Sequence, residues 1–337
     1  MPVPDPANLR PQVRRRLRRL WRHASGFARV GRRGRHNEGT TSLNDAVAAS
    51  PLMFAHKTYN TAHPDYEPEL AGNYPDRIFD AALPCDNALF RAVKQLVRWK
   101  KVPNHAWTHE LEIAMQEAKT VPGFDQIMER KIFIEQYLAQ LTQRYGSHYV
   151  AGWVNIEDAL FLYWSVRKLK PKTIVQTGVS NGLSSAFMML ALAKNGPGSK
   201  LYAIDLPAIF DPNDPAWTQK DTVFGVVVPQ GQSSGWMVPD IYHERFEVQL
   251  GDAKALLPSL IDRLDTFELF YHDSDHTYDH MMFEFDQAIR KLAPGGVIIA
   301  DDISWNASLW DFAKKLRVPS YNFRGTMGVA FLSDSRP

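Results

Sequence analysis

Two strand-like segments of this 337-residue chain end in acidic residues. An apolar run over 267–272 leads into Asp273-Ser-Asp-His276, and a second run over 296–300 leads into Asp301 and Asp302. The carboxyl ends of neighbouring parallel strands meet at one edge of a sheet, where open α/β sheets bind ligands. Carboxylate oxygens are the ligands that Mg²⁺ prefers, and a nearby imidazole can act as a base. We therefore predict that Asp273, Asp301 and Asp302 bind a divalent ion and that His276 accepts a proton.

Each of these residues could instead have a purely structural role. His276 could contact the helix that follows it, and a strand-end loop could leave only one of Asp301 and Asp302 facing the site. For Asp275 we favour a capping role, or an orienting contact with His276, over a place among the metal ligands.

A glycine-containing turn, Gln176-Thr-Gly-Val-Ser-Asn-Gly-Leu-Ser-Ser185, joins a β-rich run over 173–177 to a helical run over 184–194. Gly178 allows a tight turn, and Gly182 allows a ligand to approach the backbone. The helix begins at Ser184, where backbone N–H groups favour an anion. The Gly-x-x-x-Gly spacing differs from the Gly-x-Gly-x-x-Gly of dinucleotide sites, so a carboxylate suits this turn as well as a pyrophosphate does.

Two further acids follow the next strand-like runs. Asp205 ends the run over 200–205, a place where an acid commonly accepts hydrogen bonds from ribose hydroxyls. Asp252, in Gly251-Asp-Ala253, follows the run over 246–250 and could meet an adenine amino group. Either aspartate could instead cap a helix. The order of these features along the chain is more specific than any one of them.

The elements that must position these residues alternate from residue 171 onward. Strand-like runs over 173–177, 200–205, 246–250, 269–271 and 297–300 are separated or followed by helical runs over 184–194, 253–264, 278–292 and 308–316. This alternation predicts an α/β fold with a Rossmann-like, doubly wound, mostly parallel sheet. Residues 321–332 predict an antiparallel C-terminal hairpin at the sheet edge. Four helical patterns between residues 87 and 170 predict a helical N-terminal region before the sheet.

These patterns predict three parts of the chain. Residues 1–50 form a basic, weakly ordered tail, and residues 51–150 form an irregular and then helical region that shapes the substrate site or an oligomer contact. Residues 151–337 form the catalytic domain, with an insertion over 206–244. We predict that this insertion is a lid, with Trp217 or Trp236 stacking on the substrate. The alternative is that it packs against the helical region.

Composition is ordinary for a soluble globular protein, with 45% hydrophobic and 23% charged residues. Cys85 is the only cysteine, which excludes an internal disulfide and fits a reducing compartment. No run approaches the ~20 apolar residues of a membrane span. We therefore expect a cytoplasmic protein.

The net charge of +2 conceals an uneven distribution. Residues 1–36 hold eleven arginines against one acid, Asp5, a charge of +10, so the rest of the chain carries −8. Leu17, Leu20, Trp21 and Ala24 have helical spacing, which predicts peripheral contact with an anionic membrane at about 1 kcal/mol per basic residue. A solvated tail is the alternative. No motif beyond charge indicates specific nucleic-acid binding.

Residues about 150–335 resemble a class I S-adenosylmethionine-dependent methyltransferase of the methyltransferase-24 branch, which is related to catechol and macrolide-sugar O-methyltransferases. The resemblance rests on four segments: Thr177-Gly-Val-Ser-Asn-Gly-Leu-Ser-Ser185, Ser234-Gly-Trp-Met-Val-Pro239, Asp273-Ser-Asp-His-Thr-Tyr278 and Leu292-Ala-Pro-Gly-Gly-Val-Ile-Ile-Ala-Asp-Asp302.

The resemblance implies which residues bind the cofactor, S-adenosylmethionine. Gly178, Gly182 and Ser184 would hold its methionine part, Asp205 its ribose, and Asp252 with Ala253 its adenine, with Asp273 on the cofactor side as well as among the metal ligands. Gln176 stands where the family usually has an acid, which implies weaker cofactor binding. In related metal-dependent enzymes the proposed base lies three residues after the first metal acid, which falls on His276.

We therefore predict an S-adenosylmethionine-dependent O-methyltransferase, assisted by Mg²⁺ or another divalent ion, that acts on a hydroxyl of a small molecule or sugar. One alternative is a hydroxylase-like member of the same branch, although the acids lack the 2-His-1-carboxylate set of iron oxygenases. Another is a non-catalytic scaffold associated with a membrane or polyanion. The acceptor and the oligomeric state, a homo-oligomer included, stay open.

Overall fold

The structure is a computed structural model that describes residues 87–98, 103–323 and 326–333. The predictions for the basic tail (1–50), its amphipathic helix and the irregular segment over 51–84 lie outside these residues. All described residues belong to one structural unit of the chain.

A seven-stranded sheet, in the order β5-β3-β2-β6-β7-β9-β8, forms the centre of this unit. The strands are β2 (Thr173–Thr177), β3 (Lys200–Asp205), β5 (Phe246–Leu250), β6 (Phe267–His272), β7 (Leu292–Ala300), β8 (Ser320–Phe323) and β9 (Met327–Phe331). Strands β5 to β7 in this order are parallel, and β9 pairs antiparallel with both β7 and β8. The predicted doubly wound, mostly parallel sheet with an antiparallel hairpin is confirmed.

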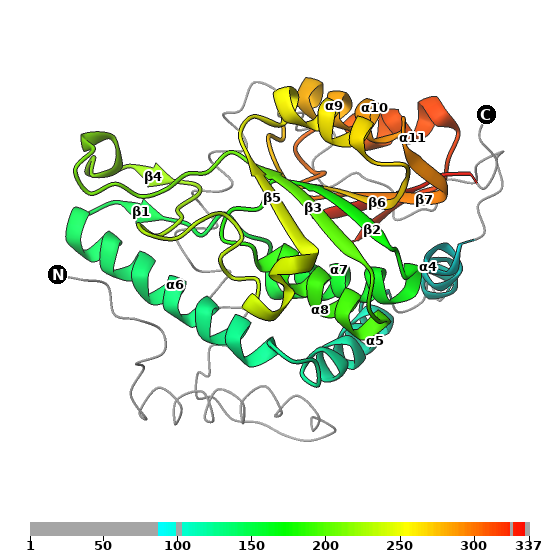
Figure 1. Cartoon of the computed structure of the whole chain (residues 1–337), viewed down its shortest axis with the longest axis horizontal. Helices are drawn as coiled ribbons and strands as arrows, with labels where there is room; N and C mark the ends of the chain where they lie inside the picture. The colour runs from blue at the N-terminus through cyan, green and yellow to red at the C-terminus, as the bar shows by residue number, and fades with distance from the viewer. Residues whose placement is uncertain (1–86, 99–102, 324–325, 334–337) are drawn as a thin grey trace, which may run out of the picture. The chain divides into compact units, whose positions relative to one another are not determined.

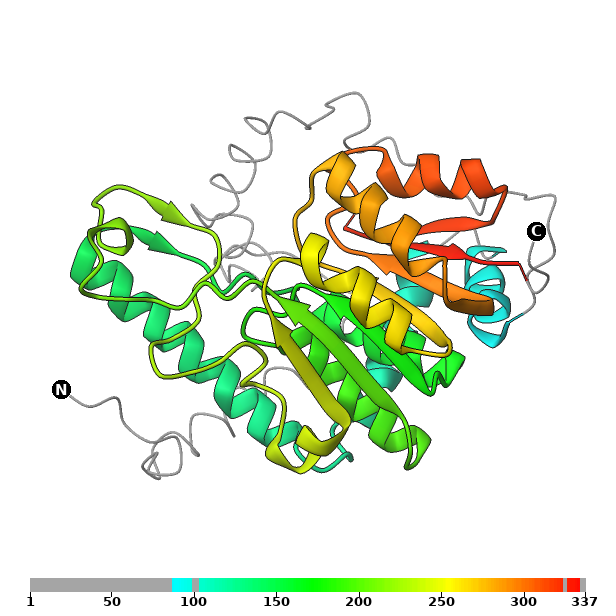
Figure 2. The same ribbon diagram turned by 45° about the horizontal axis from the view of Figure 1, so that its top comes forward.

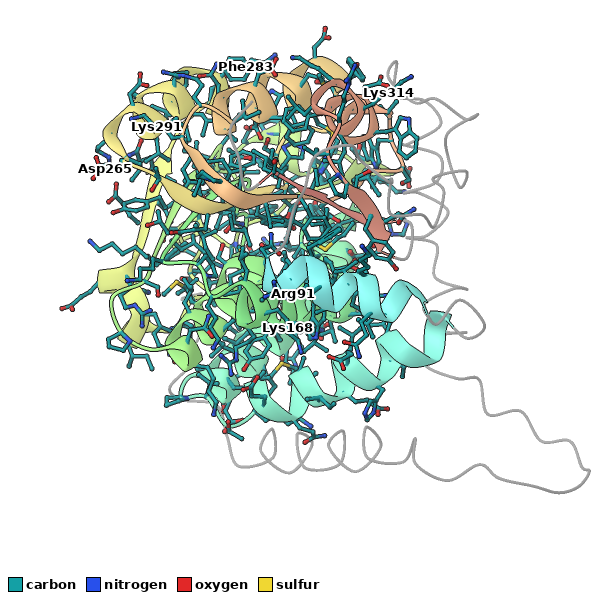
Figure 3. All side chains as sticks on the ribbon, turned by 90° about the vertical axis from the view of Figure 1, so that its right-hand side faces the viewer. Arg91, Lys168, Asp265, Phe283, Lys291 and Lys314 are labelled. Atoms are coloured by element: carbon teal, nitrogen blue, oxygen red, sulfur yellow. The ribbon has the colours of Figure 1, made fainter. Side chains whose placement is uncertain are left out.

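Helices cover both faces of the sheet, as this architecture requires. Figure 1 shows α9 (Ala253–Arg263), α10 (Tyr278–Ala288) and α11 (Ser308–Leu316) on one face. The other face carries α4 (Ala88–Arg98), α5 (Pro103–Ala118), α7 (Ile156–Leu169) and α8 (Leu183–Asn195). In Figure 3, Arg91 and Lys168 accordingly lie on the opposite side of the sheet from Phe283 and Lys314. Among the described residues, no helix has the length and apolar character needed to cross a membrane.

The sequence explains the burial of the innermost elements. Nearly every residue of β2 and β6 is buried, as expected of central parallel strands, and the polar residues among them, such as Gln176 and His272, are buried as well. In α7 every residue from Asp158 to Val166 is buried, because this helix lies between the sheet layer and α5. Its first turn is capped by Asn155, whose side chain accepts hydrogen bonds from the backbone N–H groups of Glu157 and Asp158.

One predicted helix ends earlier than expected. The sequence pattern suggested a helix over 278–292, but α10 ends at Ala288 and β7 already begins at Leu292. The reason is tertiary pairing, since Leu292 pairs with Phe267 at the start of β6.

The N-terminal helices share a hydrophobic core with the sheet. Trp107 of α5 is buried and packs against Phe161 of α7 and Phe323 of β8, with ring centroids 5.6 and 4.9 Å apart. Its indole N–H donates to the Tyr321 hydroxyl at 2.9 Å. The helix is thereby fixed to the C-terminal hairpin.

A two-stranded parallel pair lies apart from the large sheet. β1 (His148–Tyr149) follows α6 (Phe124–Tyr145), and it pairs with β4 (Val223–Phe224) of the predicted lid. Figure 2 shows this pair beside α6. The 206–244 segment is therefore held by the helical region through backbone pairing.

Candidate active site

The predicted site lies at the point in the sheet where successive strands of the chain change from one side of β2 to the other. From β2 the chain proceeds through β3 to β5 on one side, and it then returns to β6 on the other side of β2. Thr177 and His272, the last residues of β2 and β6, pair with each other, and the Asp273 N–H donates to the Thr177 carbonyl at 2.9 Å. Ligands bind at such a switch point in open α/β sheets. The glycine turn and the acidic loop both begin there.

Gly178 is required by a close approach between backbones. Its φ is +77°, and a Cβ on this residue would lie 1.8 Å from the Asp273 carbonyl oxygen. Gly182 has φ +94°, and its Cβ would lie 2.7 Å from the Cα of Gly235. The backbone that approaches Gly182 in this structure is thus that of the 206–244 segment, whereas we had expected a ligand there.

Gln176 holds the glycine turn from inside. Its buried amide N–H₂ donates to the Gly178 carbonyl at 2.7 Å and to the Ser184 hydroxyl at 3.1 Å. Its carbonyl oxygen accepts from the Ser185 hydroxyl at 2.7 Å. A carboxylate could accept from Ser185 but could donate to neither other partner. The amide therefore fixes the turn to the first turn of α8.

Asp205 also organises this turn. One oxygen of its buried carboxylate accepts from the backbone N–H groups of Val179 and Ser180, at 2.7 and 3.0 Å. The other oxygen accepts a short hydrogen bond from the Ser234 hydroxyl. A role in ribose binding stays a prediction, and the carboxylate already has three partners within the chain.

The predicted adenine residues lie at the start of α9. Asp252 is exposed and caps this helix, because its carboxylate accepts from the Lys254 N–H at 2.7 Å. Ala253 is buried in the first turn. Two leucines at the same edge are exposed: Leu206, directly after Asp205, is 72% exposed, and Leu250, which pairs with Asp205, is 56% exposed. Exposed leucines beside a polar edge provide an apolar surface that an adenine ring could cover.

The acidic residues of the two strand ends do come together. The pKa of Asp273 is raised well above its usual range by burial and by the negative charge of Asp302. Burial and the charges of Asp273 and Asp302 likewise raise the pKa of Asp301. A fourth acid, Asp158 of α7, joins them, and burial raises its pKa to about 7, with Asp302 adding to the increase. Carboxylates that raise one another's pKa lie close together.

The predicted metal ligands are near one another but are not arranged as a ligand set. In the part of the chain that the structure describes, no three Asp, Glu, His or Cys side chains are placed so that they could share a metal ion. Asp273 instead accepts a hydrogen bond from the Tyr271 hydroxyl at 3.1 Å. Asp302 has a left-handed backbone with φ +48°. The residues as placed therefore do not fit a bound divalent ion, and the magnesium prediction is not confirmed.

His276 lies beside the acids, as predicted. Its Nε2 is 3.9 Å from an Asp273 carboxylate oxygen, is buried and has no hydrogen-bond partner. The ring packs between His272 and Trp305, with centroids 5.2 and 5.4 Å away. Burial lowers the pKa of His276 to about 4, even though the charge of Asp302 acts in the opposite direction. The imidazole is therefore neutral near pH 7, with a free lone pair.

Asp275 forms a local turn immediately before α10, whose N-cap residue is Thr277, so it does not cap the helix as we had expected. Its carboxylate accepts from the Thr277 N–H at 3.1 Å, at the start of α10. The other oxygen lies 3.6 Å from Nδ1 of His280. Asp275 thus faces His280, whereas the alternative role that we considered was to orient His276.

Packing favours the alternative of contact with the helical region for Trp236, whereas Trp217 packs within the predicted lid itself. Trp236 is buried against Phe133 of α6, and its indole N–H donates to the Asn181 side-chain oxygen at 2.7 Å. Trp217 packs on Phe210 and Phe224 within the same 206–244 segment. Both indoles contact the protein itself, so the predicted stacking on a substrate is not supported.

Sequence reasoning missed three residues at this edge. Asp158 lay within a helical apolar pattern and carried no sign of its contact with the strand-end acids. Asn181, inside the glycine turn, donates to the carbonyls of Ala151 and Val227, both at 2.9 Å. The third is Ser234, the partner of Asp205. Each bridges segments far apart in sequence, which no local pattern reports.

Comparison with known proteins places this site in a family. Residues 175–303, which contain the glycine turn and the acidic strand ends, match the methyltransferase-24 family, described as a methyltransferase domain. This segment of the chain is therefore similar to a methyltransferase domain. The match agrees with the resemblance inferred from the sequence and confirms the prediction of a methyltransferase for this segment. No curated protein matches the chain in sequence.

Several solved structures are similar to this methyltransferase domain. The O-methyltransferase from Bacillus cereus in complex with SAH is 16% identical, with a TM-score of 0.42, over 59% of this chain and 90% of that one. TomG from Streptomyces achromogenes, an O-methyltransferase of tomaymycin synthesis in complex with SAM, is 16% identical, with a TM-score of 0.39 and coverage of 54% and 82%. A putative O-methyltransferase from Klebsiella pneumoniae is 17% identical, with a TM-score of 0.41 and coverage of 59% and 89%.

Proposed function

We propose that this methyltransferase transfers a methyl group from S-adenosylmethionine to a hydroxyl group of a small molecule or sugar, with His276 as the proton acceptor. The observation that carries the proposal is the juxtaposition at the ends of β2 and β6. There the glycine turn contacts the backbone of Asp273, and the loop from Asp273 carries a buried, neutral imidazole without a hydrogen-bond partner.

On the donor side, the chain supplies a fixed turn and an apolar surface. The turn from Gly178 to Gly182 is held by Gln176 and Asp205, so its backbone needs no rearrangement to receive a ligand. Exposed Leu206 and Leu250 provide the apolar surface for an adenine ring. A preformed site of this kind lowers the ordering cost of binding.

On the acceptor side, His276 has the protonation state that a base needs. Because burial keeps the pKa of this imidazole near 4, the ring is neutral at neutral pH, and Nε2 carries the lone pair in the tautomer that has its proton on Nδ1. The acceptor oxygen would form a bond to the methyl carbon as the carbon–sulfur bond breaks, and the hydroxyl proton would pass to Nε2. Asp273, 3.9 Å from Nε2, would stabilise the imidazolium that forms.

Calorimetric titration of the full chain with S-adenosylmethionine tests the donor half of this proposal. We expect saturable binding to one site. Absence of heat at millimolar cofactor would refute it. The acceptor half is tested by the release of S-adenosylhomocysteine in the presence of hydroxyl-bearing small molecules and sugars. His276→Asn should lower the rate of that release by about 10²- to 10⁴-fold without weakening cofactor binding.

Divalent-metal assistance remains a separate prediction. The proximity of Asp273, Asp301 and Asp302 supports it, and their arrangement does not form a ligand set. A rate that is unchanged by chelation, and unchanged when Mg²⁺ is added back, would exclude it. Cytoplasmic localisation, peripheral membrane contact by residues 1–50 and a homo-oligomeric state are likewise predictions.

A further inference from the structure

A buried carboxylate lies behind the active-site edge and takes no direct part in the proposed chemistry. Glu284 of α10 is fully buried and accepts four hydrogen bonds. Oε2 accepts from the Thr177 hydroxyl at 2.5 Å and from Nδ1 of His272 at 2.6 Å. Oε1 accepts from the Ser274 hydroxyl at 2.8 Å and from Nε2 of His280 at 2.9 Å. We name these five residues the Glu284 cluster.

The charge of Glu284 is stabilised by this cluster. Burial alone would raise its pKa, but the interactions with His272 and His280 outweigh burial and bring the pKa well below its usual range. An ionised carboxylate has about four acceptor positions, and Glu284 uses four. It is therefore saturated within the protein, which leaves it no capacity to bind a ligand or to act as a base.

The donors to Glu284 belong to both halves of the active site. Thr177 is the last residue of β2 and precedes Gly178 of the glycine turn. His272 is the last residue of β6 and precedes Asp273. Ser274 lies in the loop that carries His276. One carboxylate thus joins the strand end that begins the cofactor turn to the strand end that begins the acceptor loop.

The cluster also determines where His276 lies. The bond to Glu284 fixes the ring of His272, which is fully buried. That ring meets the ring of His276 edge-on, with centroids 5.2 Å apart and planes at 77°. Trp305 packs on His276 at 5.4 Å. His272 and Trp305 therefore restrict the orientation of the imidazole near Asp273.

We propose that Glu284 is a positioning residue that couples the glycine turn to the loop carrying His276, so that the donor and acceptor halves of the site are held in one fixed relation. The inference rests on the proposed function, in which these halves bind S-adenosylmethionine and the hydroxyl acceptor. Glu284 acts through Thr177 on the donor side and through His272 and Ser274 on the acceptor side.

Single-bond variants of the full-length protein separate the two sides. Thr177→Val removes the donor-side hydroxyl and keeps the shape of the side chain, Ser274→Ala removes an acceptor-side hydroxyl, and Glu284→Gln disturbs both. Two readouts are measured for each variant. The first is the affinity for S-adenosylmethionine by calorimetry. The second is the NMR signal of the His276 imidazole in ¹⁵N-histidine-labelled protein without cofactor, identified by its loss in His276→Asn.

The expected results form a pattern that a general loss of stability would not produce. Thr177→Val weakens cofactor affinity roughly three- to ten-fold, as for the loss of one buried hydrogen bond, and leaves the His276 signal in place. Ser274→Ala shifts the His276 signal and leaves cofactor affinity within about two-fold. Glu284→Gln changes both. The matched control is Glu117→Gln, which weakens the pair between Glu117 and Arg167 outside the cluster and should change neither.

A different pattern would overturn the proposal. If Thr177→Val and Ser274→Ala each lower the melting temperature but change both readouts or neither, the cluster is structural only. If Glu284→Gln does not fold, the two single-bond variants still decide. If the wild-type protein binds no S-adenosylmethionine, the proposed function fails, while the His276 signal in Ser274→Ala still shows whether the cluster positions the imidazole.

Discussion

Gly178→Ala is the substitution that most directly tests the geometry of the glycine turn. At φ +77° an L-residue costs about 1–2 kcal/mol. The added Cβ would also lie 1.8 Å from the Asp273 carbonyl oxygen, whereas C···O contacts normally begin at about 3.3 Å. The backbones must therefore separate by roughly 1.5 Å, across a strand pair joined by the Asp273 N–H bond to Thr177.

We expect Gly178→Ala to lower the free energy of unfolding by about 3–5 kcal/mol, near the upper end for single substitutions, and to abolish cofactor binding. At this chain length that corresponds to a melting temperature lower by about 4–7 °C. Gly198→Ala is a matched control, since its φ is +89° and nothing lies within 4 Å of the added Cβ. It should cost about 1 kcal/mol and leave binding intact. Equal melting temperatures and equal cofactor affinities for the two variants would refute the reasoning.

Two further predictions concern the acids and the 206–244 segment. The pKa of Asp158 is about 7 in the folded chain and about 4 in the unfolded chain, so the folded chain binds the proton more tightly. The free energy of unfolding therefore falls as the pH rises from about 4 to about 7. Asp158→Asn should therefore raise the free energy of unfolding by roughly 1–3 kcal/mol at pH 8 and by very little at pH 5. Urea denaturation at the two pH values measures this, and equal effects at both would contradict it. Arg130→Met removes bonds of 2.7 and 2.8 Å to the carbonyls of Trp236 and Val238. It should speed proteolytic cleavage within 206–244 by roughly ten-fold, whereas Arg263→Met, at an exposed ion pair, should not.

The strands of the sheet could be predicted from the sequence because their signal is local. The runs over 173–177, 200–205 and 246–250 coincide with β2, β3 and β5. β2 and β3 lie inside the sheet and are mostly buried, whereas β5 is an edge strand without a buried residue. Each is a short β-rich run bounded by turn residues, which identifies it without knowledge of its neighbours. The end of α10 was misplaced because the pairing of Leu292 with Phe267 is a tertiary contact.

The proximity of two site residues could be predicted from the sequence only where the order of the strands alone brings them together. Asp273 and Asp301 follow adjacent parallel strands, so their proximity follows from topology. Asp158 reaches the same place from α7, and nothing in its helical pattern indicates how that helix packs on the sheet. The Glu284 cluster was missed for a related reason. Its donors come from two strand ends, one loop and one helix, and they converge only in the folded chain.

The same limit applies to Gln176 and Asp205, which the family resemblance assigned to the cofactor. A residue type at a strand end shows what a side chain can donate or accept, but it does not show which partner is nearest. Here the nearest partners are the backbone and hydroxyl groups of the glycine turn itself. An amide at position 176 donates to the Gly178 carbonyl, which an ionised acid could not do, so the departure from the family pattern agrees with the local structure. The turn that we propose to receive the cofactor is consequently fixed by the chain itself, and changes at either residue should act on the turn first and on affinity through it.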